Sequence, residues 1–569
     1  QDGDLKSYEF YSYNNLKNTH GNQQTPPPAN PVIPGSEIRG MIRTAYEALT
    51  NSCLSTIDPK MSFHKRAPKS DKSGKPGILR KNATGWEIVP CIRYMLKTSR
   101  CFDDLFEFNP PYTQNYTPPY TDWPAWRKHM ADLEKNNSQV WIRPGARYKR
   151  RPYMDCLICE FKESYTPGLQ MGYVHVTAHF EDKKHHDSVF VEQGIAPIPI
   201  SPDVACNYLE NLKFCIAHDT FGPEYAHLDK GDNIDKYNNV CVYYTEYGGN
   251  KYLSPSMINR EMLYKKLADR IGDYEPCDDS NHLCPACSLF GMVSDKGSVS
   301  SRLRFSDAEP MAGTTEFMAP VLLEELASPK PSATEFYLES PPNQANWNYD
   351  YQMRWFVQQN NGRKVTLLQK TNYTAKIRGR KFYWHQPRVK TSSLLSVTHL
   401  NEEQKKKLLR MCLVRPLEKG KFKFKVFFDR VSKYDVYKLA FILTIGFSTD
   451  HAHKIGMGKP LGLGSVQLDV KVMSIRELDN NCERKHKRFD LTDLNTRNSI
   501  RNRFGNTLGN NGILDQFLAL AKVNHNYEVR YPYILDEHGA EKEENYAWFV
   551  ANKQIEGIGR PNNPKIDQT

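Results

Sequence analysis

Three cysteines and one histidine lie close together near the middle of the chain. Cys277, Cys284 and Cys287 form the pattern C-x6-C-P-A-C, and His282 lies between the first two cysteines. Two thiolates three positions apart, with a third nearby, can supply three of the four ligands of a tetrahedral zinc site. The spacing therefore predicts a structural zinc, whose fourth ligand is His282 or a residue distant in sequence. The alternative is a chance group of buried free cysteines.

A glycine-rich segment with one lysine is the second candidate site. It contains Gly456, Gly458, Lys459, Gly462 and Gly464. It is neither a Walker A loop nor a dinucleotide fingerprint, because no Gly-Lys-Ser/Thr follows at the required spacing. Glycine lets a backbone approach phosphate groups closely, and the lysine adds a positive charge. A phosphate-binding loop and a tight helix-to-strand connection both explain this pattern.

Basic residues and aromatic rings adjoin one another along the chain. The sequence has 77 Lys and Arg against 65 Asp and Glu, a formal charge of +12, and 32 Tyr. The basic patches lie at residues 64–75, 143–151, 376–381 and 483–488. Cations contact phosphates and rings stack on bases, so these patches fit single-stranded RNA. An ordinary solvated surface is the alternative for any one patch.

The composition excludes several classes of protein. Of the 569 residues, 39% are apolar and 25% are charged, which is typical of a folded chain of about three domains or of one domain with large insertions. The longest apolar run, Leu439 to Phe447, is too short to cross a bilayer, so no membrane is expected as a partner. The 13 cysteines are mostly scattered singly, which argues against a disulfide scaffold and favours a cytoplasmic location.

The elements that position these residues begin with a strand and a helix. A strand-like stretch at Leu5–Tyr13 leads into a proline-rich loop. The helix then begins with Ser36 as its expected cap and continues through about residue 51. Arg39 and Arg43 are four residues apart and therefore lie on one face of this helix.

A second strand and helix follow in the C-terminal half. Residues 421–428 alternate, with Phe and Val facing one side and Lys421, Lys423 and Lys425 facing the other. Ser432 then caps an apolar helix, the glycine-rich segment follows, and Ser465–Val472 is strand-like. These elements make half of a ferredoxin-like βαββαβ module, and the opening strand and helix can supply the other half. The expected fold class is α+β.

The expected organisation divides this core around insertions. The insertions are inferred from irregular, proline-rich stretches without a repeat. The expected parts are the first half of the core (1–52), an insertion (53–255), the zinc-binding segment (256–310), a second insertion (311–400), the second half of the core (401–475) and a C-terminal extension (476–569).

Four segments that occur in this order carry a resemblance to a known family. They are Ile-Pro-Gly-Ser-Glu-Ile-Arg-Gly at 33–40, Cys-Pro-Ala-Cys-Ser-Leu-Phe-Gly at 284–291, Ser-Arg-Leu-Arg-Phe-Ser-Asp-Ala at 301–308, and the glycine-rich segment. Together they resemble the RAMP superfamily of CRISPR-associated proteins, particularly the backbone (Cas-seven-like) subunits of type III effector complexes. The segment Ile-Arg-Gly-Arg-Lys-Phe-Tyr-Trp-His at 377–385 is similar to a signature of a large RAMP subfamily with long insertions.

The resemblance implies an RRM-like, ferredoxin-like core that binds guide RNA (crRNA) by its backbone, while base pairing reads the target RNA. Other CRISPR effector subunits are then expected as partners. A helix N-terminus attracts anions, and the two arginines of the first helix extend that surface. The residues expected to contact RNA are Gly35, Ser36, Arg39, Arg43, Arg378, Arg380, Lys381, Gly456, Gly458, Lys459, Gly462 and Gly464.

The same resemblance leaves catalysis open. Cleaving subunits of the family use an Asp in the loop just before the first helix, together with a divalent metal. Residues 10–32 contain no Asp or Glu, and His20 is their one acid-base candidate near neutral pH. The other candidates are Asp2, Asp4, Asp103, Asp104 and Asp122. The chain is therefore expected to be structural, with Mg²⁺ or Mn²⁺ needed only if it cleaves RNA.

Two other functions fit part of the sequence. The first is a RAMP-type endoribonuclease that processes guide precursor RNA without metal, with His451 or His453 beside the glycine-rich segment as general base. The second is a zinc-stabilised interaction scaffold that binds no RNA. The cysteine cluster and the first helix favour a backbone subunit over the processing enzyme.

Overall fold

The computed structural model shows a mixed α/β chain in which strands outnumber helices. It describes residues 6–13, 27–28, 30–66, 74–97, 99–102, 105–108, 123–144, 156–176, 186–218, 225–257, 260–323, 334–339, 346–360, 363–372, 374–385, 411–478, 480–509, 512–523, 534–535 and 541–542. The chain forms two compact units, each assembled from segments that are far apart in sequence. Within the described ranges, no helix is long and apolar enough to span a membrane.

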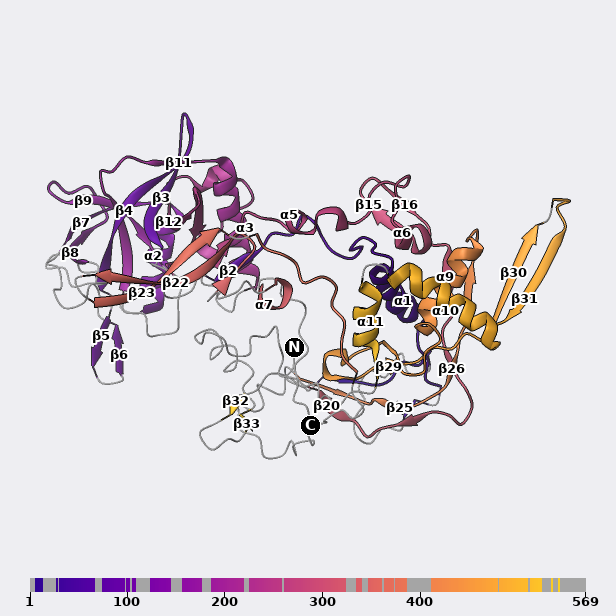
Figure 1. Ribbon diagram of the computed structural model, residues 1–569. Coiled ribbons are helices and arrows are strands. Elements are labelled where there is room, and N and C mark those ends of the chain that lie inside the picture. The colour runs from indigo at the N-terminus through magenta and orange to yellow at the C-terminus, as the bar shows by residue number, and fades with distance from the viewer. Residues whose placement is uncertain are drawn as a thin grey trace. The chain divides into compact units, whose positions relative to one another are not determined.

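The first unit comprises residues 1–59, 271–330 and 378–569 (Figure 1). Its helices are α1 (Gly35–Leu49), α6 (Pro285–Phe290), α9 (Lys433–Thr444), α10 (Leu494–Gly509) and α11 (Ile513–Ala521), with the 3-10 turns η5 (Gly272–Tyr274) and η7 (Lys459–Leu461). Its strands are β1 (Lys6–Tyr8), β15 (Met292–Ser294), β16 (Gly297–Val299), β17 (Leu303–Phe305), β18 (Glu309–Pro310), β19 (Glu316–Phe317), β20 (Val321–Leu323), β24 (Cys412–Val414), β25 (Leu417–Lys419), β26 (Phe422–Lys423), β27 (Val426–Phe428), β28 (His453–Lys454), β29 (Ser465–Val466), β30 (Val472–Leu478), β31 (Arg484–Asp490), β32 (Ile534–Leu535) and β33 (Glu541–Lys542).

A long antiparallel ribbon forms the sheet of this unit. It runs from the pair β17–β27 through β18–β26 and β19–β25 to β20–β24. Leu303 lies opposite Phe428 at one end, and Leu323 lies opposite Cys412 at the other. β1 pairs with β24 in parallel, so the strand order at this end is β1–β24–β20. Within the described residues 6–13 of the expected strand Leu5–Tyr13, the paired part is Lys6–Tyr8.

One face of the ribbon packs against α1 and α9. Buried Ile42 of α1 and Ile442 of α9 belong to one apolar core, against which the side chains of β26 and β27 lie partly buried. The alternation expected along residues 421–428 is confirmed, because Phe422, Phe424, Val426 and Phe428 pack inward while Lys421, Lys423 and Lys425 are exposed. Period-two patterning therefore gives the ribbon one apolar face and one exposed face, called here the cationic face, on which lysines outnumber the two opposing glutamates Glu309 and Glu316.

The start of α1 differs from the expectation that Ser36 caps it. The helix begins at Gly35 with Pro34 as its N-cap, and Ser36 lies exposed in the first turn without a capping bond. The carboxylate of Asp307 takes that role, because its Oδ1 accepts the Gly35 N–H at 2.7 Å. A Cβ at Gly35 would lie 2.3 Å from the carbonyl oxygen of Phe305, so only glycine permits this close approach.

Two expectations for the C-terminal half have different outcomes. The prediction for α9 is confirmed, because the Ser432 hydroxyl accepts the Asp435 N–H at 3.0 Å. The strand expected at Ser465–Val472 is interrupted: β29 pairs with β28, and β30 pairs with β31 from Val472 onward. The chain changes partners between the two strands, and this change cannot be read from the alternation of its side chains.

The second unit comprises residues 60–270 and 331–377, and the expected insertion 53–255 falls largely within it. Its helices are α2 (Trp123–Lys135), α3 (Pro202–His218) and α7 (Thr334–Tyr337), with η3 (Ala226–Leu228), η4 (Ile234–Tyr237) and, at its border, α5 (Ala268–Ile271). Its strands are β2 (His64–Arg66), β3 (Lys75–Asn82), β4 (Gly85–Lys97), β5 (Ser99–Phe102), β6 (Leu105–Phe108), β7 (Gln139–Pro144), β8 (Cys156–Lys162), β9 (Gln170–His175), β10 (His186–Glu192), β11 (Ile198–Ile200), β12 (Val240–Tyr247), β13 (Asn250–Ser254), β14 (Arg260–Met262), β21 (Asn346–Trp347), β22 (Tyr351–Asn360) and β23 (Arg363–Asn372).

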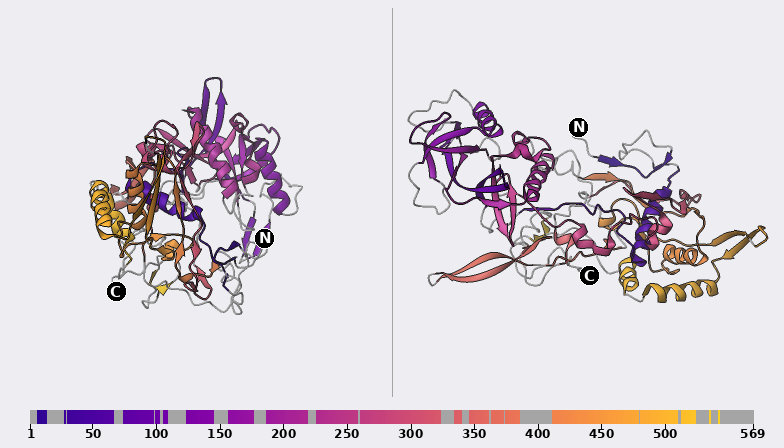
Figure 2. Two further views of the ribbon diagram at one scale, coloured as in Figure 1. Left: turned by 90° about the vertical axis from the view of Figure 1, so that its right-hand side faces the viewer. Right: turned by 90° about the horizontal axis from the view of Figure 1, so that it is seen from above.

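Five strands of this unit pair in a closed ring (Figures 1 and 2). β4 pairs with β8 and β10, β7 pairs with β8 and β9, and β9 pairs with β10. The long β4 also pairs with β3 and so connects the ring to the β3–β12–β13 sheet. Trp126 of α2 packs with Val140 and Phe161 in the core of the ring, while Tyr208 and Leu212 of α3 pack in a second core.

Candidate metal centre

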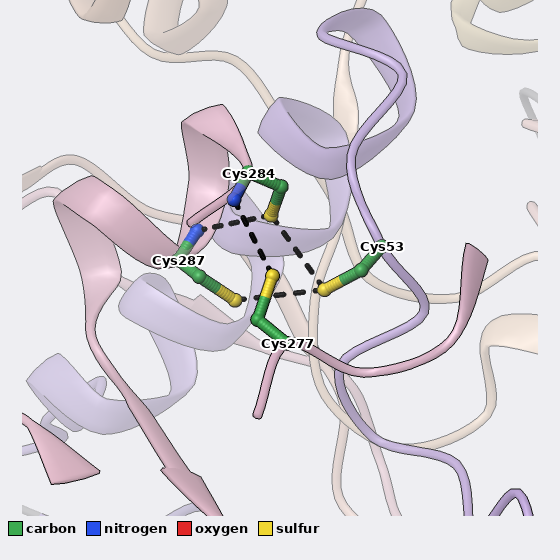
Figure 3. Close-up of side chains that lie close together, drawn as sticks. All are labelled: Cys53, Cys277, Cys284 and Cys287. Carbon is green, nitrogen blue, oxygen red and sulfur yellow. Dashed lines mark hydrogen bonds between the residues drawn. The ribbon is translucent and has the colours of Figure 1, made fainter. Parts of the chain in front are cut away.

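Four cysteines from three segments of the first unit converge on one point (Figure 3). Cys53 follows α1, Cys277 lies in the loop before α6, Cys284 is the N-cap of α6 and Cys287 lies in its first turn. All four sulfurs lie within 4.8 Å of one another, and Cys53 Sγ is 3.5 Å from Cys287 Sγ and 3.6 Å from Cys284 Sγ. A tetrahedral Zn²⁺ with Zn–S distances near 2.3 Å separates its sulfurs by about 3.8 Å. The cluster therefore has the dimensions of a four-thiolate metal site.

Backbone N–H groups already point at two of the sulfurs. The Cys284 N–H lies 3.3 Å from Cys277 Sγ, and the Cys287 N–H lies 3.4 Å from Cys284 Sγ. Pro285 occupies the first turn of α6, where its fixed φ suits the helix start. Gly291 ends α6 with φ +79°, and a Cβ there would lie 2.5 Å from the Val299 carbonyl oxygen. This turn is therefore preorganised to hold ligands.

Hydrogen bonds between the sulfurs shift the pKa values of three of these thiols. The hydrogen bond with Cys287 lowers the pKa of the Cys284 thiol. The hydrogen bond with Cys284 raises the pKa of Cys287, and raises that of Cys53 to about 12. Metal binding requires thiolates, so a bound divalent cation replaces the shared protons. A closed set of four thiolates leaves no open coordination position, which is typical of a structural site rather than a catalytic one.

Of the two alternatives for the fourth ligand, His282 or a residue distant in sequence, the structure brings the distant Cys53 into the group and leaves His282 outside it. His282 is exposed, and its Nδ1 lies 2.6 Å from Asp279 Oδ2 at the surface. Cys53 is buried and reaches the cluster because the end of α1 packs beside α6. Cys53 lies far in sequence from the other three cysteines, so no local spacing identifies it as a member of the cluster. Cys53 was also assigned to the start of the insertion, but it belongs to the first unit.

Two arginines expected at RNA instead have partners around the cysteine cluster. Arg43 donates from Nη2 to Cys287 Sγ at 3.5 Å and pairs through Nε with Glu47 at 2.8 Å. Arg380 pairs with the other oxygen of Glu47 at 3.3 Å and donates to the Cys53 carbonyl at 3.1 Å. Glu47 is buried, so the two guanidinium groups balance its charge. The segment 377–385 is thereby tied to the cluster.

Gly35 and Arg39, which were also expected at RNA, have internal partners as well, whereas Ser36 is exposed. Arg39 donates to the Phe290 carbonyl at 2.5 Å and lies over the Phe290 ring; burial and then the charge of Arg43 lower its pKa. At the helix N-terminus, Asp307 also accepts the Tyr13 hydroxyl, which lowers the pKa of Asp307 and raises that of Tyr13 to about 12. The carboxylate thus occupies the position expected to attract a phosphate.

The glycine-rich segment forms a tight loop in which every glycine has a left-handed backbone. The φ values are +79°, +74°, +93° and +80° for Gly456, Gly458, Gly462 and Gly464. Lys454 closes the loop: its ammonium donates to the Gly462 carbonyl and, at 2.9 Å, to that of Leu463, and burial lowers its pKa to about 8. The half-buried Lys459 begins η7.

The histidines beside this loop differ in position. His453 is buried, its Nε2 lies 3.1 Å from the carbonyls of Ile442 and Leu443, and burial lowers its pKa to about 4. It therefore donates to the last turn of α9 instead of facing a substrate. His451 is half-buried, with Nδ1 2.6 Å from the Ser448 hydroxyl.

Some of the other expected site residues lie within the described part of the chain, and the rest lie outside it. Arg378 and Lys381 are exposed, and the Lys381 ammonium lies 5.2 Å from the Tyr383 ring centre. The catalytic candidates His20, Asp2 and Asp4, and the acidic candidates Asp103, Asp104 and Asp122, lie outside the described residues.

No protein-family model matches the chain, and no curated protein matches it.

Proposed function

We propose that the chain is a guide-RNA-binding backbone subunit of a type III CRISPR effector complex, with a structural zinc and without a cutting site of its own. It holds the crRNA by its phosphates while the guide pairs with target RNA. Its other partners are further subunits of the effector, and its compartment is the reducing cytoplasm, where thiolates persist.

The cationic face of the ribbon carries this proposal. Lys421, Lys423 and Lys425 project from it, and in the described part of the chain none of the three forms an ion pair, although the exposed Glu309 lies opposite Lys423. Phe427 lies beside them with half of its side chain exposed, and the Arg304 guanidinium lies 5.9 Å from its ring centre. Unpaired cations next to an exposed ring provide phosphate contacts and a stacking surface for a base.

The order of the elements supports part of an RRM-like core behind that face. In a ferredoxin-like βαββαβ fold the third strand lies between the first and the second and is antiparallel to both. The ribbon and β1 have the corresponding order, β1–β24–β20, with β20 antiparallel to β24, but β1 is parallel to β24, so the direction of the first strand departs from that fold. α1 follows the first strand and α9 follows the third, and both pack against the same core. The zinc fastens the end of α1 to α6 within this arrangement.

The position of His453 favours the structural subunit over the metal-independent processing enzyme. A general base must reach its substrate, whereas this imidazole is buried and donates to α9. Incubation with repeat-containing precursor RNA in EDTA tests this choice. The proposal expects no cleavage, and cleavage that His451→Ala abolishes would favour the processing enzyme.

The direct test is RNA binding by the full chain. The triple variant Lys423→Ala, Lys425→Ala, Phe427→Ala should weaken binding of unrelated single-stranded RNAs by about tenfold, because phosphate and stacking contacts do not depend on sequence. The matched control is Lys236→Ala, Lys265→Ala, Lys266→Ala, which removes three exposed lysines from the second unit. Equal affinities for wild type and the ribbon variant would contradict the proposal, and so would the absence of RNA from the purified protein.

A further inference from the structure

A projecting two-stranded hairpin carries a group of exposed arginines. β30 and β31 pair over seven positions from Val472 opposite Asp490 to Leu478 opposite Arg484. Figures 1 and 2 show the hairpin extending away from α9 and α10 of the same unit. Every residue of β31 except the half-buried Phe489 is exposed.

The two faces of the hairpin differ in their basic residues. Buried Met473 and Ile475 define the inward face, on which Phe489 also packs against the core. Directly paired residues share a face, so Lys485 and Lys487 lie on this inward side. The charge of Lys487 is balanced there, because its ammonium lies 2.9 Å from Glu477 Oε2.

The outward face carries arginines. Alternation along the strands places Arg476, Arg484 and Arg488 there together with His486. The hairpin's described residues offer no ion-pair partner to these three arginines, and the carboxylate of Asp490 at the base is held by Thr492. Arg484 and Arg488 are four residues apart on β31, which separates them by about 14 Å, and Arg476 lies diagonally across from both, at about 7–8 Å. Asp490 is the carboxylate near Arg488, and the remaining positive charges repel one another, so an anionic partner on this face would stabilise the hairpin.

We propose that this outward face clamps the phosphate backbone of single-stranded RNA, at a site separate from the ribbon face. The proposal rests on the proposed function and adds a second contact surface to it. The distribution of basic residues, with arginines on the outward face and lysines on the inward face, favours phosphate over a carboxylate-bearing protein partner. Guanidinium groups bind phosphate through two parallel hydrogen bonds and are weakly hydrated, whereas the lysines, which act as point charges, lie on the other face.

The experiment measures RNA affinity against salt concentration for the full, zinc-loaded chain with a labelled single-stranded RNA of mixed sequence. In Arg476→Ala, Arg484→Ala, Arg488→Ala, the slope of log K against log salt should fall by about 2, since each lost single-strand phosphate contact contributes about 0.7. Affinity near physiological salt should fall by about tenfold. The matched variant with lysine at all three positions should retain the slope, because it keeps the charges. Unchanged zinc content and melting temperature in both variants show that the fold is intact.

Each outcome decides between the proposals. An unchanged slope in the alanine variant, with wild-type RNA binding intact and weakened by the ribbon variant, overturns the hairpin site alone. A wild-type chain that binds no RNA overturns the proposed function itself. Competition by polyglutamate as strong as by RNA overturns the choice of a phosphate backbone and points to an acidic protein partner.

Discussion

Arg43 of α1 directs its guanidinium at the metal centre, with Nη2 3.5 Å from Sγ of Cys287. Its Nη1 donates to the Gly291 carbonyl at 3.1 Å, so the same side chain also holds the end of α6. Four thiolates around a divalent ion leave an excess of negative charge, which a neighbouring cation offsets. Arg43, expected at RNA from the sequence, therefore has a structural position beside the metal site.

The first prediction concerns this contact. Arg43→Ala should lower zinc affinity by about 10- to 100-fold, because groups that orient and charge-balance metal ligands contribute on this scale. Competition with a chromophoric chelator measures the effect. Arg39→Ala is the matched control, because Arg39 lies one turn earlier on α1 and donates to a carbonyl rather than to a sulfur. Equal affinities for the two variants would remove the role of Arg43.

The second prediction concerns the identity of the ligands. Cys53→Ser should reduce bound zinc from about one ion per chain to nearly none and lower the melting temperature, because metal binding and folding are linked. His282→Ala should retain the zinc, since that histidine is exposed and pairs with Asp279. Elemental analysis of chelator-free protein gives the stoichiometry. Zinc loss in the histidine variant with zinc retained in the cysteine variant would reverse the assignment.

How far the sequence predicts this site depends on how local each signal is. The pair Cys284 and Cys287 follows from spacing alone, and alternation along residues 421–428 predicts both faces of the ribbon. Cys53 and Arg380 reach the same point only through packing of distant segments, and periodicity carries no information on that. The prediction for the start of α1 fails for the same reason, because the carboxylate that caps the helix, Asp307, comes from another segment.

The third prediction separates two uses of glycine in the loop after α9. Gly464→Ala should destabilise the first unit by several kcal/mol, because its Cβ would lie 1.9 Å from the Ile455 carbonyl oxygen and its φ is +80°. Gly456→Ala should cost only about 1 kcal/mol, since its Cβ meets nothing within 4 Å and only the left-handed backbone is strained. Chemical denaturation measures both. Similar losses in the two variants would contradict the close approach.

The fourth prediction concerns a buried carboxylate in the second unit. Glu134 of α2 lies 2.6 Å from His175 Nδ1 and 2.8 Å from His227 Nε2. Burial alone would raise the pKa of Glu134, but the charge and hydrogen bond of His175 and the contact with His227 outweigh it and lower the pKa to about 2. Glu134→Ala should destabilise this unit by about 3–5 kcal/mol, because it leaves buried partners unpaired.

The pH dependence of that unit follows from the same shift. A depressed carboxyl pKa stabilises the fold above the unfolded value near 4.5, and this contribution is lost as the pH falls toward 2. The alanine variant should lack that part of the acid transition. Asp232→Ala is the control, because Asp232 pairs with Lys213 at the surface, where solvent screens the pair and its loss should have little effect on stability. Equal destabilisation by both changes would contradict the buried role.

The last prediction concerns His453 and the end of α9. Burial lowers its pKa to about 4, below the unfolded value near 6.5, so the unfolded chain binds the proton more tightly. Stability of the first unit should therefore fall as the pH drops from about 6.5 to 4, by about 3 kcal/mol in total. His453→Leu should be less stable at pH 7, because the carbonyls of Ile442 and Leu443 lose their donor, but should lack this pH dependence. Hydrogen-exchange protection of the α9 amides at pH 7 and 5 measures both effects, with His282→Ala as an exposed-histidine control that keeps the wild-type response. A histidine-to-leucine variant with an unchanged pH response would show that another group causes the acid sensitivity and would reopen a functional role for this imidazole.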